Sequence, residues 1–400
     1  MTIESKPVLR GNVLMTVNPM GLKQEIQNQI DYVKSQGHYE GPKKVLVLGA
    51  SSSYGLATRI TTAFGAGADT IGVSYDKGPR SEKNLGTPGW YNNIFFRQAA
   101  EKEGLVAKNF VGDAFSQELK DDVIHYIKEE FGGKVDLVVY SLATGRRTDP
   151  ETGQTYHSAI KSIGQEVVGP NINLQKEELY EEVLEPASEE EIEATVKVMG
   201  GEDWYGWIKL LNEAGVLAEG VQTVIYSYLG SDLNRSYYQD GTLGRAKADC
   251  DEKADWINQE LEDLAGKAQV VVATAVTTKA SAVIPFFPIY CIALYKVMAE
   301  RGTHETPIMH QDRIYRDMIY GDQAAYDDKG RLRPDLWELD PEVQAQTEAL
   351  IKKITLENFK TDLTAYDLLW HEFLNLNGFD VDGDDGQEAV DLDDLKALEA

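Results

Sequence analysis

Short apolar segments alternate with longer amphipathic segments through residues 43–300. The amphipathic segments, such as Gln117–Glu130, predict helices. The apolar segments are rich in β-branched residues and predict six buried strands: Lys44–Gly49, Asp69–Tyr75, Lys108–Gly112, Val135–Ser141, Gln222–Tyr228 and Gln269–Thr274. Strands that are apolar on both faces and separated by helices are typical of a parallel sheet covered on both sides. We therefore predict a doubly wound, mostly parallel α/β sheet of the Rossmann type.

Additional segments flank this core and interrupt it. Residues 1–42 predict a hairpin around Val8–Val17 followed by a helix over Gly21–Gln36. Residues 301–400 predict a helical extension that ends in an acidic tail from Asp380, which we expect to be solvated.

An insertion of about residues 144–220 separates the fourth and fifth predicted strands. Within it, Ser188 and Glu191 have the spacing of a capping box, which predicts a helix that reaches about Met199. The pattern favours one catalytic unit over residues 1–400 rather than separate domains.

Composition narrows the possible partners. The 400 residues include 39 basic and 66 acidic side chains, so the net charge of −27 disfavours both nucleic acid and an anionic membrane surface. Cys250 and Cys291 make neither a metal-site spacing nor a disulfide framework, which favours a reducing cytosol. Residues 1–10 lack the apolar core of a signal peptide, so we expect a cytoplasmic protein.

The longest uncharged segment, Ala280–Tyr295, contains two prolines and is too short to span a bilayer, so we expect it to be buried or to face a ligand. The acidic tail alternates aspartate with other residues, but its glycine and distal glutamate do not fit a calcium loop, and we expect no metal site.

A turn rich in small residues follows the first predicted strand and opens a helix. Glycines there let the backbone approach a pyrophosphate, and the helix N-terminus offers free N–H groups. Because the spacing differs from the usual dinucleotide motif, a simple strand-to-helix turn is the alternative. The predicted cofactor contacts are Gly49, Ala50, Ser51, Ser52, Ser53, Tyr54 and Gly55.

Acidic residues follow the next two strands. Asp76 lies about where an acid accepts hydrogen bonds from the adenosine ribose, and its charge would repel the 2′-phosphate of NADPH, so it favours NADH. Lys77 and Arg80 soften that preference. Asp113, beside Ala114, is predicted either to bind the adenine amine or to cap a helix. Ser141 and Leu142 end the fourth strand at the edge where such cofactors lie.

Tyr238 and Lys247 form the candidate acid–base pair. A reductase that adds hydride to an activated double bond must stabilise an enolate and supply a proton, and tyrosine can do both if a nearby lysine lowers its pKa. Gly241 and Gly244 can end helical continuity between the two residues, leaving Tyr238 on a loop and Lys247 on the next helix. Tyr228 ends the fifth strand at the same edge, either as a second active phenol or as a core tyrosine.

Motifs spread over nearly the whole chain resemble the trans-2-enoyl-CoA reductases and the FabV-class enoyl-acyl-carrier-protein reductases. The Tyr238-x8-Lys247 spacing is that family's signature. The other matching segments are Val45–Gly55, Gly86–Asn92, Tyr140–Ala143, Arg146–Thr148, Met199–Trp204, Tyr226–Tyr228, Ala280–Pro285 and Phe373–Phe379.

The resemblance implies a monomeric enzyme that uses NADH to reduce the C2=C3 bond of an acyl thioester. It implies that Tyr238 donates the proton, that Lys247 holds the cofactor and that Tyr228 contacts the thioester. It also implies cofactor contacts from Tyr75, beside Asp76, and an acyl pocket lined by Ala280–Tyr295. The implied loop contacts with the cofactor are Val276, Thr277 and Thr278.

Three questions stay open at this stage. The acyl carrier is either CoA or an acyl carrier protein, and docking of either acidic carrier would need a basic patch such as Arg146, Arg147 or Lys279. A short-chain-type carbonyl reductase is a second possible enzyme, although no Tyr–Lys pair of its usual closer spacing follows the fifth strand. A non-catalytic dinucleotide-binding protein is the third possibility, and it would have no need of a proton donor.

Overall fold

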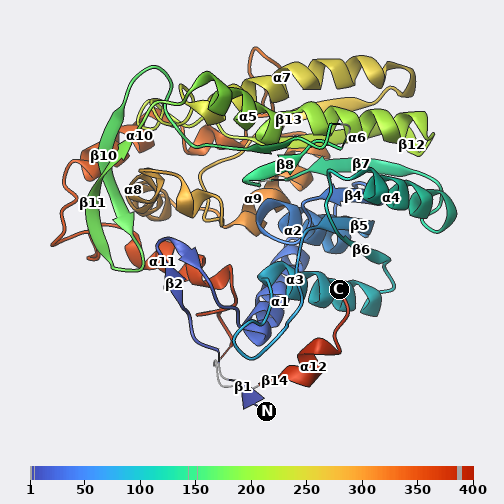
Figure 1. The fold of residues 1–400 in the computed structure, drawn as a ribbon, viewed down its shortest axis with the longest axis horizontal. Coiled ribbons are helices and arrows are strands. Elements are labelled where there is room, and N and C mark those ends of the chain that lie inside the picture. Colours follow the sequence, from blue (N-terminus) through green and yellow to red (C-terminus); the bar gives the residue numbers. More distant parts are fainter. Residues whose placement is uncertain (1, 4, 143, 151, 385–389) are drawn as a thin grey trace.

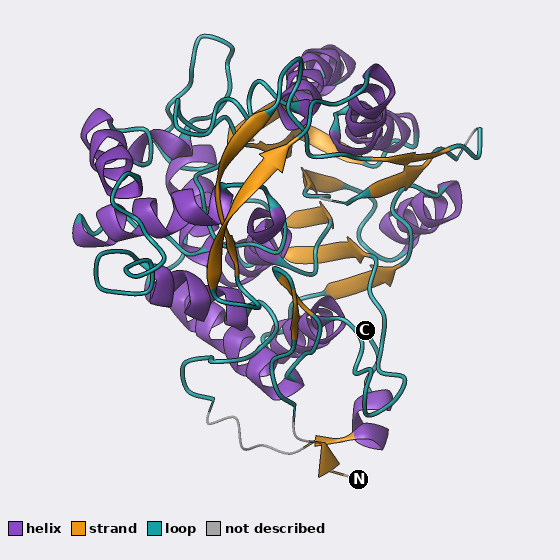
Figure 2. Ribbon diagram, turned by 60° about the vertical axis from the view of Figure 1, so that its left-hand side comes forward, coloured by secondary structure: helices purple, strands orange, loops and turns teal. Residues whose placement is uncertain are grey.

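A six-stranded parallel sheet forms the centre of the molecule (Figure 2). The computed structural model describes residues 2–3, 5–142, 144–150, 152–384 and 390–400. The strand order is β13-β12-β7-β4-β5-β6, and every neighbouring pair is parallel. The strands are β4 (Lys44–Leu48), β5 (Asp69–Ser74), β6 (Ala107–Val111), β7 (Val135–Tyr140), β12 (Leu217–Ser227) and β13 (Lys267–Val272). This order confirms the predicted doubly wound sheet, and it puts the topological switch point between β4 and β7.

Helices cover both faces of the sheet (Figure 1). One face carries α4 (Gln117–Glu129), α6 (Glu202–Glu213) and α7 (Thr242–Glu260); the other carries α1 (Pro19–Ser35), α2 (Ser53–Ile60), α3 (Pro88–Lys102) and α9 (Pro307–Arg313). Successive residues of β4 point to opposite faces, so Leu46 packs with Trp204 and Trp207 while Val47 packs with Tyr315. This two-sided burial is the reason for the uninterrupted apolar strands.

The insertion contains more strand than the sequence indicated. Its elements are β8 (Arg146–Thr148), β9 (Thr155–His157), β10 (Val167–Asn173), β11 (Glu178–Leu184), α5 (Glu189–Met199) and the already named α6. The capping box of Ser188 and Glu191 is formed as predicted. The β10–β11 hairpin was missed because both strands are partly exposed and carry glycine, proline and glutamate. The fifth sheet strand, β12, begins at Leu217 rather than at the predicted Gln222.

The C-terminal segment packs beside the insertion (Figure 1). It contains the helical turns η4 (Ile314–Ile319) and η5 (Pro334–Trp337) and the helices α10 (Pro341–Ile351) and α11 (Tyr366–Asn375). The turn η3 (Ser281–Val283) and the helix α8 (Phe287–Glu300) come directly before it in the chain. Almost all of α8 is buried, as expected for the uncharged segment. A π-helical turn, η1 (Thr61–Gly65), extends α2, and a short 3-10 turn, η2 (Glu262–Leu264), follows α7.

The N-terminal and C-terminal segments meet on the lower side of the molecule, where β1 (Thr2–Ile3) and β14 (Val390–Asp391) lie side by side (Figure 1). The predicted N-terminal hairpin is β2 (Leu9–Arg10) with β3 (Val13–Leu14), while β1 pairs with β14, ahead of α12 (Leu392–Lys396). Most of the described residues from Asp380 onward are exposed or half-buried, as expected for a solvated tail, while Val381 and Leu395 are buried. Residues 385–389 of the tail lie outside the described residues.

Candidate active site

The turn after β4 has the geometry of a phosphate-binding loop. Gly49 has φ +89°, and a Cβ there would lie 2.3 Å from the carbonyl oxygen of Ser141. A Cβ on Gly55 would lie 1.9 Å from the carbonyl oxygen of Gly49. Both glycines are therefore needed for the close approach of turn and helix. The Ser52 side chain does not cap α2, so the first N–H groups of that helix are free for an anion.

Asp76, directly beyond β5, has one carboxylate oxygen committed and one without a partner. Its Oδ1 accepts from Thr87 Oγ1 at 2.7 Å, whereas Oδ2 is buried and has no hydrogen-bond partner among the residues that the structure describes. A buried polar atom without a partner is costly, and a ribose hydroxyl would satisfy it. The Tyr75 side chain, in contrast, is 64% exposed. The structure thus suits the predicted ribose contact of Asp76.

The other predicted cofactor contacts after β4 and β7 lie at the same edge. Ala50 is buried, and the carbonyl oxygen of Ser51 accepts from Asn92 Nδ2 at 2.9 Å. Tyr54 donates to the carbonyl oxygen of Thr274 at 3.1 Å, which joins the phosphate turn to the loop after β13. Ser53, with φ +49°, opens α2, and Ser141 and Leu142 lie half-buried beside the turn. Ala143 lies outside the described residues.

Asp113 and Ala114 lie apart from the switch point, because they follow the edge strand β6. Asp113 Oδ1 accepts from the backbone N–H of Phe115 at 3.0 Å, and the Ala114 carbonyl accepts from Trp207 Nε1 at 3.1 Å. The helix-cap alternative for Asp113 is wrong, because Ser116 is the N-cap of α4. Contact of Asp113 or Ala114 with the adenine remains a prediction.

Each candidate acid–base residue contacts the carboxyl end of β12 or the residue that follows it. Tyr238 lies in the turns before α7, and Lys247 lies on that helix, as predicted. The rings of Tyr228 and Tyr238 meet edge to face with centroids 4.8 Å apart. Lys247 Nζ donates to the carbonyl oxygen of Tyr226 at 2.9 Å, which fixes its ammonium group on the same strand.

The two phenols differ in their hydrogen bonds. Tyr228 donates to Glu338 Oε1 at 2.7 Å and accepts from Asn234 Nδ2 at 2.8 Å. The Tyr238 hydroxyl makes no hydrogen bond to any residue that the structure describes. Tyr238 is therefore the phenol whose proton is available to a ligand.

The expected effect of Lys247 on the Tyr238 phenol is not seen. Burial raises the pKa of Tyr238 above its ordinary value, whereas a lowered pKa was predicted. The ammonium of Lys247 is directed at the Tyr226 carbonyl, and desolvation of the phenol dominates. Tyr238 is consequently protonated at neutral pH, which suits a proton donor.

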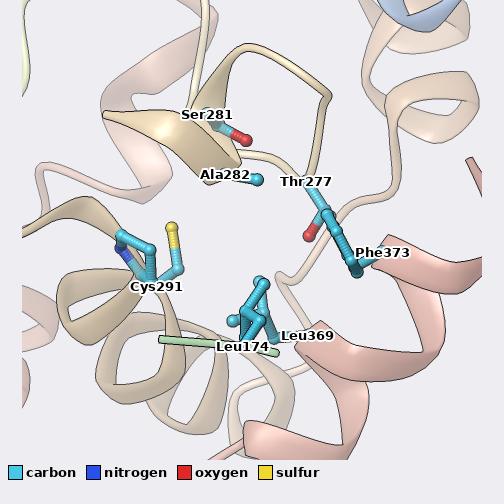
Figure 3. Close-up of a pocket in the computed structure, with 8 residues that line it drawn as sticks. Leu174, Thr277, Ser281, Ala282, Cys291, Leu369 and Phe373 are labelled. Atoms are coloured by element: carbon cyan, nitrogen blue, oxygen red, sulfur yellow. The ribbon is translucent and has the colours of Figure 1, made fainter. Parts of the chain in front are cut away.

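The loop after β13 carries the last predicted cofactor contacts, and all three are buried: Val276, Thr277 and Thr278. Thr277 donates to Glu372, and it borders a small cavity together with residues of the uncharged segment (Figure 3). Thr277 and Phe373 lie on one side of this cavity and Cys291 lies on the other (Figure 3). The lining residues are Leu174, Thr277, Ser281, Ala282, Pro288, Cys291, Leu369 and Phe373.

Sequence reasoning missed the buried polar residues that support this loop. His310 Nε2 accepts from the Thr274 N–H at 3.2 Å, and Glu338 Oε2 accepts from the Ala275 N–H at 2.6 Å. Glu305 in turn contacts His310 Nδ1 at 2.7 Å. None of these residues has a sequence signal, because their partners are distant in the chain.

The fold and the phosphate turn define the class of dinucleotide-binding reductases. Comparison with known proteins narrows this class. Residues 84–320 match the model described as the trans-2-enoyl-CoA reductase catalytic region, and residues 4–81 match the NAD(P)H binding domain of trans-2-enoyl-CoA reductase. The chain belongs to the trans-2-enoyl-CoA reductase family, as the motifs indicated.

Named relatives cover almost the entire chain. An enoyl-[acyl-carrier-protein] reductase [NADH] of Photobacterium profundum is 49% identical over 99% of both chains. A trans-2-enoyl-CoA reductase [NADH] of Clostridium beijerinckii is 49% identical over 98% of this chain and 99% of its own. The crystal structure of the Clostridium acetobutylicum trans-2-enoyl-CoA reductase in complex with NADH has a TM-score of 0.96, with 48% identity and full coverage of both chains.

A third family model, matching residues 326–390, is described as an enoyl reductase FAD binding domain. The described part of this segment contains helices and the short strand β14, without a parallel strand and glycine turn for a second dinucleotide. Its buried carboxylates, Asp335, Glu338 and Glu372, are bonded to other protein groups. The segment therefore does not fit a flavin.

Proposed function

We propose that this chain catalyses the NADH-dependent reduction of the C2=C3 double bond of trans-2-enoyl thioesters to saturated acyl thioesters. The observation that carries the proposal is the free hydroxyl of Tyr238, which packs against Tyr228 at the sheet edge that also holds the phosphate turn. Relatives of nearly equal identity are named for CoA and for acyl-carrier-protein substrates, so the proposal covers both thioesters.

NADH, when bound, supplies the hydride that reaches the β carbon. Tyr238 hydrogen-bonds the developing enolate oxygen and supplies the proton that the α carbon receives, and its raised pKa keeps that proton on the phenol until the enolate forms. Lys247 holds the cofactor ribose, and Tyr228 contacts the thioester. The phosphate turn and the Val276–Thr278 loop hold the cofactor, and Asp76 accepts from its ribose.

The cavity of Figure 3 supports an acyl site in the Ala280–Tyr295 segment, because its lining is mostly apolar. The basic surface available for docking an acidic carrier is smaller than we expected from the sequence. Arg147 is buried and paired with Glu202 at 2.9 Å, which leaves Arg146 and Lys279 exposed.

The chain is proposed to work as one catalytic unit, since residues matched by all three family models contribute to the loop after β13 or to its supports. A cytosolic location is a further proposal, supported by two buried cysteines that form no disulfide. A monomeric state is proposed from the family resemblance. Within the described residues, no helix has both the length and the apolar composition that a membrane span requires. Light scattering of the purified chain measures the oligomeric state.

The test is NADH oxidation with crotonyl-CoA, followed by absorbance. Tyr238→Phe keeps the ring but removes the proton, so kcat is expected to fall by about 10²–10⁴-fold with NADH binding retained. Tyr237→Phe, a neighbouring buried tyrosine, is the matched control and is expected to stay active. Turnover of ketones alone, or full activity of Tyr238→Phe, would overturn the proposal.

A further inference from the structure

Glu338 is a fully buried carboxylate that contacts Tyr228 of the proposed active site. It lies between η5 and α10 and is 0% exposed. Four donors reach it: Tyr228 Oη at 2.7 Å and Tyr290 Oη at 2.7 Å on Oε1, and Thr274 Oγ1 at 2.8 Å and the Ala275 N–H at 2.6 Å on Oε2. Among the described residues no cation pairs with it. Burying an acid without a counter-ion is costly, so its place in the core calls for a role.

The first consequence concerns the proton of Tyr228. A phenol has one hydrogen, and that of Tyr228 is donated to Glu338. Asn234 Nδ2 donates to the same phenol oxygen at 2.8 Å. These two bonds fix the rotation of the Tyr228 hydroxyl and the position of its ring, against which Tyr238 packs. Tyr228 is thereby held in one orientation, in which its ring supports Tyr238. Tyr238 is then the phenol whose proton is not donated to a protein group.

The second consequence concerns the loop after β13. Glu338 bonds Thr274 and Ala275, which directly precede the Val276–Thr278 segment that we propose to contact the cofactor. One carboxylate therefore ties this loop to Tyr228. The link joins the proposed cofactor contact to the proposed substrate contact through a residue of the C-terminal segment.

We propose that Glu338 is a positioning residue of the enoyl reduction, which orients the Tyr228 hydroxyl and the start of the cofactor loop relative to Tyr238. This inference rests on the proposed function. The inference gives a role in orienting the active site to residues 326–390, the segment that matches the model described as an FAD binding domain.

The decisive variant is Glu338→Gln, which keeps the shape but leaves one oxygen for four donors. We expect kcat for crotonyl-CoA to fall about 10–100-fold, because the phenol and the loop lose their shared acceptor, while KM for NADH changes less than about threefold. The matched control is Glu342→Gln on α10, whose side chain is 68% exposed and pairs with Arg301. It is expected to leave kcat unchanged.

A double variant separates positioning from a general loss of stability. Because Glu338 acts in part through Tyr228, Glu338→Gln combined with Tyr228→Phe is expected to lose much less than the product of the two single losses. If Glu338→Gln fails to fold, Thr274→Val removes one donor to the carboxylate and is expected to lower kcat about 3–10-fold with little change in Tm.

The inference would be overturned if Glu338→Gln left kcat unchanged, or if the losses in the double variant were fully multiplicative. If Glu338→Gln does not fold, an unchanged kcat in Thr274→Val would overturn it. An inactive wild-type enzyme with crotonyl-CoA and NADH would instead overturn the proposed function. The two failures are therefore distinguishable in one set of assays.

Discussion

The cofactor side and the catalytic side of the sheet edge are built in different ways. The cofactor side, with the phosphate turn and Asp76, is assembled from β4, β5, β7 and the start of α3. Asp76 accepts from Thr87, which lies 11 positions away, although Tyr54 also reaches the distant Thr274. On the catalytic side, Tyr228, against which Tyr238 packs, is held by a residue from beyond residue 300. Glu338 lies 110 positions from the Tyr228 that it binds.

The two buried acids show what this difference means. Asp76 has one buried carboxylate oxygen without a hydrogen-bond partner among the described residues, as expected for a group that binds a donor of the ligand. Both oxygens of Glu338 are bonded to protein donors, which is the state of a group that orients its neighbours. In these two examples, the acid that follows a local sequence motif has an oxygen available to a ligand. The acid that lies far along the chain from the catalytic tyrosines holds one of them in position.

Among the variants that test this difference between the two sides, we expect the largest effect from Gly49→Ala on the cofactor side. The new Cβ would lie 2.3 Å from the Ser141 carbonyl oxygen at φ +89°, so the turn must open. NADH affinity, measured by fluorescence titration, should fall by about 100-fold, which corresponds to ~3 kcal/mol. Gly104→Ala, with φ +77° and no atom within 4 Å of the new Cβ, is the control. Equal losses in both variants would contradict a role for close packing.

Acid should weaken the supports of the catalytic side. Burial opposes ionisation of Glu305, but hydrogen bonds from Arg313 and His310 prevail and lower its pKa from 4.5 to about 2. Since the folded-state pKa is the lower one, the stabilisation is present above pH 4.5 and is lost as the pH falls toward 2, by about 2–3 kcal/mol.

Urea unfolding of the wild type and of Glu305→Gln at pH 5 and pH 3 measures this loss. The variant should be less stable at pH 5 and should lose less on acidification. Glu342→Gln serves as the control, since its exposed carboxylate should leave the wild-type acid dependence intact. Parallel acid losses in the wild type and in Glu305→Gln would exclude Glu305 as the source.

The smallest expected effect is a change of cofactor preference at Asp76. Asp76→Ser removes the charge that would oppose the 2′-phosphate of NADPH, so kcat/KM with NADPH should rise about tenfold, while that with NADH falls by a similar factor. Glu82→Gln removes an exposed charge from the same loop and should change neither value. An unaltered ratio in Asp76→Ser would show that discrimination lies elsewhere.

Much of the fold could be predicted because its signals are local. Apolar β-branched segments marked all six sheet strands, and Ser188 with Glu191 marked the start of α5. The β10–β11 hairpin lacked such a signal, since glycine, proline and glutamate interrupt the apolar residues of its strands. The strands pack against the core through only some of their positions, among them Ile172. The effect of burial on the Tyr238 pKa was missed because burial depends on the whole core.

By itself, the sequence determined the order of strands and helices, the glycine turn at Gly49 and the presence of Tyr238 and Lys247 in their family spacing. The tertiary structure decided which phenol keeps a free proton and which carboxylate supports the loop after β13. The physical reason is that a periodic pattern reports only on neighbours in one strand or helix. The bonds of Glu338 exist only after segments far apart in the chain have packed together.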